Sequence, residues 1–190
     1  MTGRTDLDIL NNMIMDSAKV NIEHNSSDPN KSSVTLNEPQ SPTSEVTIYG
    51  LPHNAIVIKV DTFKSPDTIL TETRGQRKRS DYIIVTDKKG KKNILYIEIK
   101  TTKGKENDII NQLKGSVCFV GYCKEIAKEF WHEKDFLSEF ESRFVSFTHT
   151  GSIDKKPTRI NKKYNPNDTP KRMLKLRHPH KPQFNHLVGA

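Results

Sequence analysis

The sequence has little apolar material and no long apolar run. Its 190 residues are 33% hydrophobic, include one tryptophan, and have a mean hydropathy of −0.73. No segment is apolar for long enough to predict a membrane-spanning helix, and the acidic start at Asp6 and Asp8 is not typical of a signal peptide. We therefore expect a cytoplasmic protein without a membrane partner, built as one domain with extensions.

Cysteine is also scarce, which excludes a disulfide framework. Only Cys118 and Cys123 are present, five positions apart in a helix-like segment and without a second ligand pair at zinc-site spacing. We expect two free thiols. Three histidines lie in the basic C-terminal segment, where solvated side chains are a safer interpretation than a metal site: His178, His180 and His186.

Positive charge is unevenly distributed along the chain. Residues 1–150 hold 21 Lys and Arg against 21 Asp and Glu, whereas residues 151–190 hold ten against two. The net charge of +8 therefore belongs to the last forty residues. Such a segment suits phosphate backbones, but it could equally be a solvated extension that keeps the protein soluble.

The chain begins with a predicted helix and a predicted linker. Apolar residues at helical spacing predict a short amphipathic helix over residues 5–20. Residues 23–46 are rich in Asn, Ser, Thr and Pro, and this composition predicts a flexible linker.

The centre of the chain predicts an α/β domain. Runs of β-branched and aromatic residues predict strands at 55–60, 82–86 and 94–99, and Gly90 suits a hairpin turn between the last two. Apolar residues at helical spacing follow from Ile110 onward, and a fourth strand is predicted at 143–148. The order is helix, three strands, helix, strand. The predicted organisation is an N-terminal helix (1–22), a linker (23–46), a core with a four-stranded mixed sheet flanked by helices (47–150), and a flexible basic tail (151–190).

Three ionisable residues in the predicted hairpin carry the functional signal. In an alternating strand Glu98 and Lys100 point the same way, and both are disfavoured there unless they have partners or a function. Asp81 begins the preceding strand, so a hairpin that turns near Gly90 brings it close to them. Two neighbouring carboxylates on one open side suit Mg²⁺, and a lysine beside them can position a water and stabilise charge on phosphoryl oxygens. The alternative is a surface ion pair between Glu98 and Lys100, with Asp81 as an ordinary strand-start residue.

The segment RSD, the seventeen-residue step from Asp81 to Glu98, and EIK resemble the signature of the PD-(D/E)XK nuclease superfamily. This resemblance covers roughly residues 55–148 and implies a restriction-endonuclease-like core. It implies that Asp81 and Glu98 bind Mg²⁺, for which Mn²⁺ often substitutes, and that Lys100 acts on the attacking water. Ser80 stands where the family name has proline.

The resemblance also suggests further site residues. Many members carry a polar residue on the following helix, where Gln112 and Lys114 lie here; Gln112 could face the site or be an ordinary surface amide. Members often add an acid on the first helix, and the choice between Asp16, Glu23 and Glu45 stays open.

Two basic segments are predicted to contact nucleic acid. The first is the loop before Asp81, and the second is the C-terminal tail. The predicted contacts, with Lys114 on the helix, are Arg74, Arg77, Lys78, Arg79, Lys171, Arg172, Lys175 and Arg177.

These features predict a Mg²⁺-dependent endonuclease that hydrolyses DNA, with RNA not excluded, acting by analogy in restriction or antiphage defence. A junction resolvase or repair nuclease is an alternative within the same chemistry. The alternative from another class is a nucleic-acid-binding or protein-interaction module on an inactive nuclease-like scaffold. A homodimer or an obligate partner protein stays open.

Overall fold

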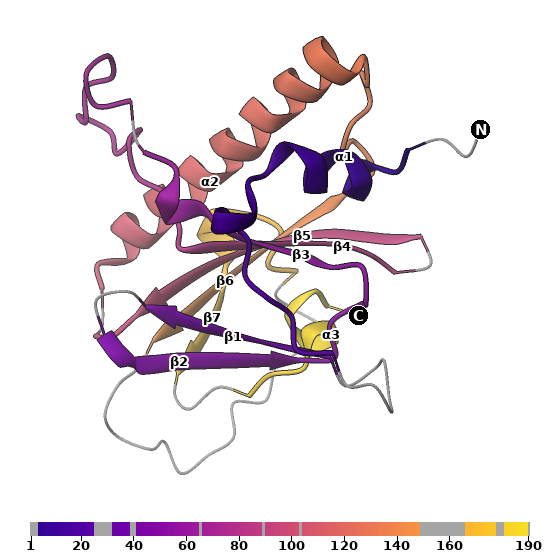
Figure 1. Ribbon diagram of the computed structural model, residues 1–190. Helices are drawn as coiled ribbons and strands as arrows, with labels where there is room; N and C mark the ends of the chain where they lie inside the picture. Colours follow the sequence, from indigo (N-terminus) through magenta and orange to yellow (C-terminus); the bar gives the residue numbers. More distant parts are fainter. Residues whose placement is uncertain are drawn as a thin grey trace.

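The protein is a mixed α/β fold in which a five-stranded sheet separates two apolar cores. The computed structural model describes residues 4–24, 32–38, 41–64, 66–88, 90–102, 104–148, 166–177 and 181–189. Figure 1 shows the sheet with α1 and α2 on one face and the pair β1 and β2 on the other. No helix in these ranges is both long and apolar enough to cross a membrane.

The central sheet has the strand order β3-β4-β5-β6-β7. Its strands are β3 (Ile56–Lys59), β4 (Tyr82–Lys88), β5 (Lys91–Lys100), β6 (Glu141–Thr148) and β7 (Leu174–Arg177). The first three are antiparallel, and β6 and β7 then add in parallel. The four predicted strands are confirmed, and the sheet has one strand more than predicted.

The hairpin between β4 and β5 turns where the sequence indicates. Gly90 has a φ of 82°, a conformation that glycine adopts without strain, and its N–H donates to the Asp87 carboxylate at 3.2 Å. Register then pairs Ile83 with Tyr96 and Tyr82 with Ile97. This register determines which residues at the open end of the hairpin meet.

The helices are confirmed with different bounds. α1 (Asp6–Met13) is shorter than predicted and begins in a capping box, since Thr5 and Asp8 hydrogen-bond reciprocally. A 3₁₀ turn, η1 (Asp16–Ala18), follows it. α2 (Glu106–Ile126) continues through Gly121 into a π-helical segment, η4 (Ala127–Trp131), and connects β5 to the parallel β6.

The prediction of a flexible linker over residues 23–46 is wrong for its second half. β1 (Ser33–Glu38) and β2 (Ser41–Tyr49) form an antiparallel pair against the central sheet. Four apolar side chains in them are fully buried: Val34, Leu36, Val46 and Ile48. The polar average of the segment hides this alternation of apolar and polar positions, which is the period of a half-buried strand.

The prediction of a flexible basic tail from residue 151 is wrong for the described residues 166–177 and 181–189. η5 (Pro170–Arg172) leads into β7, and α3 (Phe184–Leu187) packs its apolar side chains into the core between β1–β2 and the central sheet. His178 and His180 lie outside the described residues.

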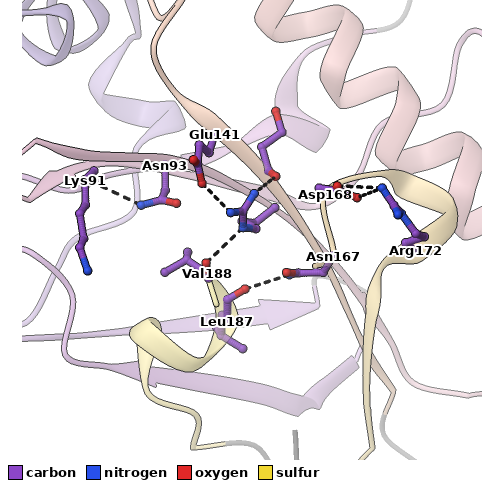
Figure 2. A network of polar contacts seen from close by, with 10 residues as sticks. Lys91, Asn93, Glu141, Asn167, Asp168, Arg172, Leu187 and Val188 are labelled. Carbon is purple, nitrogen blue, oxygen red and sulfur yellow. Dashed lines mark hydrogen bonds and ion pairs between the residues drawn. The ribbon is translucent and has the colours of Figure 1, made fainter. Parts of the chain in front are cut away.

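Polar contacts attach this C-terminal segment to the sheet (Figure 2). In Figure 2 the Asn167 side chain donates to the main-chain oxygen of Leu187, at 2.9 Å. It also donates to the main-chain oxygen of Phe144 at 3.2 Å, and Arg143 Nε donates to the Val188 oxygen at 3.1 Å. The segment is part of the fold, because these bonds satisfy main-chain oxygens of β6 and of the segment's own end.

Candidate functional site

Asp81 and Glu98 meet at the open end of the β4–β5 hairpin. The register that pairs Tyr82 with Ile97 places Asp81, one position earlier, opposite Glu98. The Ile99 N–H donates to Asp81 Oδ2 at 2.7 Å, so the aspartate is held against β5. The structure therefore brings together the two carboxylates, as the predicted hairpin requires.

Lys100 completes this group on the same face of β5. Its Nζ lies 2.5 Å from Glu98 Oε1. The Glu98 side chain has no exposed surface, whereas 26% of the Lys100 side chain is exposed. Lys100 is thus the member of the pair that solvent reaches.

Burial shifts the acid–base equilibria of this group. Burial, with the Asp81 carboxylate nearby, raises the pKa of Glu98 to about 8 despite Lys100. Burial also raises the pKa of Asp81 to about 6, against the opposing effect of the Ile99 N–H. Burial alone would lower the pKa of Lys100, but the adjacent Glu98 carboxylate outweighs it and the pKa is raised. The positive charge of Lys100 therefore does not fully compensate the two carboxylates.

Two further acids lie near enough to act on Asp81. Asp61, in the 3₁₀ turn η3 (Val60–Thr62), and Glu38, at the end of β1, both raise the pKa of Asp81. Burial raises the pKa of Asp61 itself. Sequence reasoning missed both residues, because Glu38 lay in the predicted linker and Asp61 directly followed a predicted strand.

The three acids considered as an additional acidic site residue have other contacts. Asp16 pairs with Lys19 at 2.9 Å, and the Glu23 carboxylate accepts from Ser33 at 3.4 Å. The Glu45 carboxylate accepts from Thr47 at 3.4 Å on β2. Asp61 and Glu38 are therefore better placed for this role than any of the three.

The residue before Asp81 is anchored to α2. The Ser80 N–H donates to Ser116 Oγ at 2.8 Å, and the two hydroxyls lie 2.7 Å apart, with both residues fully buried. Beside them Gly115 lets the loop approach closely, because a Cβ at that position would lie 1.7 Å from the Lys78 oxygen. Ser80 thus ties the residue before Asp81 to α2.

Most cations of the loop before Asp81 have partners within the protein. Arg77 pairs with Glu72 at 2.6 Å, Lys78 pairs with Asp108 at 2.8 Å, and Arg79 lies over the Phe63 ring. Arg74 is exposed. Contact of this loop with nucleic acid stays a prediction, and Arg74 is its most accessible cation.

The α2 residues are less closely tied to the site. Gln112 is half-buried, and within the described chain no hydrogen bond links it to Asp81 or Glu98. Lys114 is exposed. Cys118 and Cys123 are free, as predicted, and burial raises the pKa of Cys123 to about 12.

The basic C-terminal residues fall into two places. Lys171 is exposed on η5, and Arg172 pairs with Asp168 at 2.5 Å. Lys175 and Arg177 lie on β7, where they are exposed and register with Ser146 and Thr148 of β6. These two cations therefore share a sheet with Glu98 and Lys100.

The carboxylates meet one requirement of a cation site, since Glu98 Oε2 is a buried oxygen without a hydrogen bond in the described residues. A divalent cation between Asp81 and Glu98 would offset their repulsion, and carboxylate oxygens suit Mg²⁺. Among the described residues no group of three or more His, Cys, Asp or Glu is arranged as a metal site.

No protein-family model, curated protein or solved structure matches the chain.

Proposed function

We propose that this protein is a Mg²⁺-dependent nuclease that hydrolyses phosphodiester bonds of DNA. The observation that supports this best is the meeting of Asp81, Glu98 and Lys100 on one face at the open end of the hairpin. We further propose that the sheet, α1 and α2 are a restriction-endonuclease-like core. The resemblance of RSD and EIK to the PD-(D/E)XK signature supports this interpretation.

In this proposal the acidic side chains and the more accessible Lys100 have different roles in hydrolysis. Asp81 and Glu98 would hold the cation, since their carboxylates are adjacent and undercompensated. When bound, Mg²⁺ supplies Lewis-acid stabilisation of the charge that builds on the phosphoryl oxygens. Lys100 keeps its ammonium at the accessible edge, where it can orient a water and stabilise negative charge on the phosphate.

DNA is proposed as the substrate from the usual substrate of the family that the motif resembles. An excess of Lys and Arg on β7 and η5 fits a polyanion. By analogy with that family we propose restriction or antiphage defence as the role, with junction resolution or repair as alternatives that use the same chemistry.

The proposal is tested by incubating the purified protein with supercoiled, linear and branched DNA and with RNA. Each substrate is tested with Mg²⁺, with Mn²⁺ and with a chelator. We expect metal-dependent cleavage of at least one DNA form. The alternative, a nucleic-acid-binding module on an inactive scaffold, predicts binding to the same substrates without cleavage in either metal.

A further inference from the structure

A groove of about 660 Å³ opens next to Glu98 and Lys100, at the carboxyl ends of the parallel strands β6 and β7 and the first turn of α2. Across β5, β6 and β7, one row of paired residues is Glu98, Ser146 and Lys175. The next row on the same face is Lys100, Thr148 and Arg177. Carboxyl ends of neighbouring parallel strands are a common place for ligands in α/β sheets. Two polar rows therefore run from the carboxylate site into the groove.

Packing shows which face of the sheet these rows occupy. Tyr96 stacks on Phe144 with ring centroids 4.7 Å apart, and Met173 belongs to the same apolar cluster under α2. Two residues further along each strand, the side chains on that face change to Glu98, Ser146 and Lys175. The apolar core ends here, and the groove begins.

Ser146 points to a ligand in this groove. It is 2% exposed and lines the groove, yet its hydroxyl has no hydrogen-bond partner in the described residues. Buried hydroxyls are nearly always hydrogen-bonded in folded proteins. The unpaired Ser146 hydroxyl therefore suits a ligand that accepts hydrogen bonds.

The charges around Ser146 suit an anion. Lys105, Lys175 and Arg177 line the groove, and the first turn of α2 begins at Lys105 without a side-chain cap. Main-chain N–H groups of a helix start favour an anion. Glu106 opposes this, because its carboxylate pairs with Lys175 at 2.8 Å.

We propose that the groove binds the phosphate backbone of a nucleic-acid strand, with Ser146 donating to a phosphate oxygen, Lys175 and Arg177 neutralising its charge, and Glu106 giving up Lys175 on binding. The proposal rests on the proposed function for the identity of the polymer. Neighbouring strands lie about 4.8 Å apart, so the main chain of Lys175 lies about 10 Å from that of Glu98. The groove therefore holds backbone within a few nucleotides of the carboxylates.

The test measures binding of a fluorescein-labelled DNA duplex by anisotropy across several salt concentrations, without divalent metal. Replacing both groove cations, K175A/R177A, should weaken binding at least tenfold near physiological salt and make the salt slope shallower by up to about 1.8, at about 0.9 for each phosphate. K124A/K128A is the matched control, since it removes the same charge at Lys124, near the end of α2 and about 28 Å from Lys105 at 1.5 Å per residue, and at Lys128 in the following segment η4. The control should change binding less than threefold.

Two single substitutions test the particular contacts. Glu106→Gln should tighten binding, because it frees Lys175 and removes an acid from the groove. Ser146→Ala should weaken binding without lowering the melting temperature, because the hydroxyl makes no bond within the described protein. The proposal is overturned if K175A/R177A loses no more affinity than the control, or if Glu106→Gln weakens binding.

A parallel cleavage assay keeps this outcome separate from the proposed function. If the groove variants weaken binding as expected but the wild type shows no metal-dependent cleavage, the proposed nuclease function is contradicted and the proposed groove is supported. If the wild type cleaves DNA but the groove variants bind it as tightly as the wild type, only the proposed groove is contradicted.

Discussion

Glu98 is a carboxyl group without exposed surface, placed beside a second carboxyl and one lysine. Burying two acids costs free energy unless they are neutralised, either by protons or by a cation. The raised pKa values of Glu98 and Asp81 mean that, without a cation, protons neutralise these carboxylates up to a higher pH than usual. If the pair holds Mg²⁺ as proposed, the metal must compete with protons for these carboxylates.

The first prediction is a dependence of stability on pH. The folded pKa values of about 6 and about 8 lie above the ordinary values of 3.8 for Asp81 and 4.5 for Glu98. The folded protein therefore keeps protons that the unfolded chain has released, and this stabilisation is lost as the pH rises from about 4 to about 8. Relative to D81N/E98Q, the wild-type melting temperature without metal should fall over this range.

Thermal melts of both proteins between pH 5 and pH 9, with chelator and then with Mg²⁺, provide the measurement. Mg²⁺ should restore wild-type stability at pH 8, because it binds the folded state, and should not affect the variant. A wild-type to variant difference that stays constant with pH would show that these carboxyls are not shifted.

The second prediction concerns Lys100, whose ammonium lies at the accessible edge of the site. Lys100→Ala should slow single-turnover cleavage by roughly 100-fold while changing DNA affinity little, because a positioned donor acts mainly on transition-state charge worth about 3 kcal/mol. Rates and affinities are measured on the same duplex. Equal losses in both would identify Lys100 as a phosphate-binding residue instead.

At the scale of single elements, the position of Asp81 depends on how its loop meets α2. Ser80 bonds to Ser116, and Gly115 allows the Lys78 main chain to lie against the helix. A helix with a side chain at Gly115 would push this loop away. The loop and α2 therefore act as one support for the carboxylate.

The third prediction follows from that contact. Gly115→Ala places a Cβ 1.7 Å from the Lys78 oxygen, so it should destabilise the protein by about 1 to 3 kcal/mol and reduce cleavage. Gly121→Ala is the matched control in the same helix, since nothing lies within 4 Å of its new Cβ. It should stabilise the protein by up to about 1 kcal/mol. Denaturant unfolding measures both, and equal effects of the two would refute the close packing.

The elements that sequence predicted well are those with a strong local pattern. The β4–β5 hairpin has β-branched runs on both sides of Gly90, and its register alone placed Asp81 beside Glu98. β1 and β2 were missed because their apolar positions are separated by polar residues and their average composition resembles a linker. With them Glu38 was missed, although its charge acts on Asp81.

At the scale of the whole molecule, the described residues 166–177 and 181–189 include both exposed cations and buried apolar side chains. Lys175 and Arg177 are exposed, but Leu176, Phe184 and Leu187 between and after them are buried. Net charge could not reveal this, because it depends only on the charged residues, which lie on the exposed face of β7. It carries no information about the apolar residues on the buried face. The sequence thus indicated the basic character of the segment correctly and its role in the fold incorrectly.

The fourth prediction is that deletion of residues 151–190 prevents folding. Among the described residues, the deletion removes β7, α3 and five buried apolar side chains: Met173, Leu176, Phe184, Leu187 and Val188. Each contributes about 1.5 to 3 kcal/mol, and together they rival the 5 to 15 kcal/mol that typically stabilises a domain. Circular dichroism melts of the truncated and full-length proteins test this. A cooperative transition at the full-length temperature would restore the picture of a separate tail.

The central claim is that Asp81, Glu98 and Lys100 form a metal-dependent hydrolytic site. The most direct measurement is single-turnover cleavage of DNA in Mg²⁺ by the wild type, Glu98→Gln, and Glu133→Gln as a control at an exposed acid. Glu98→Gln keeps the size of the buried side chain and removes its charge, so it should remain folded and lose cleavage by at least 1,000-fold, whereas the control should cleave like the wild type. A folded Glu98→Gln protein that cleaves DNA at the wild-type rate would contradict the claim.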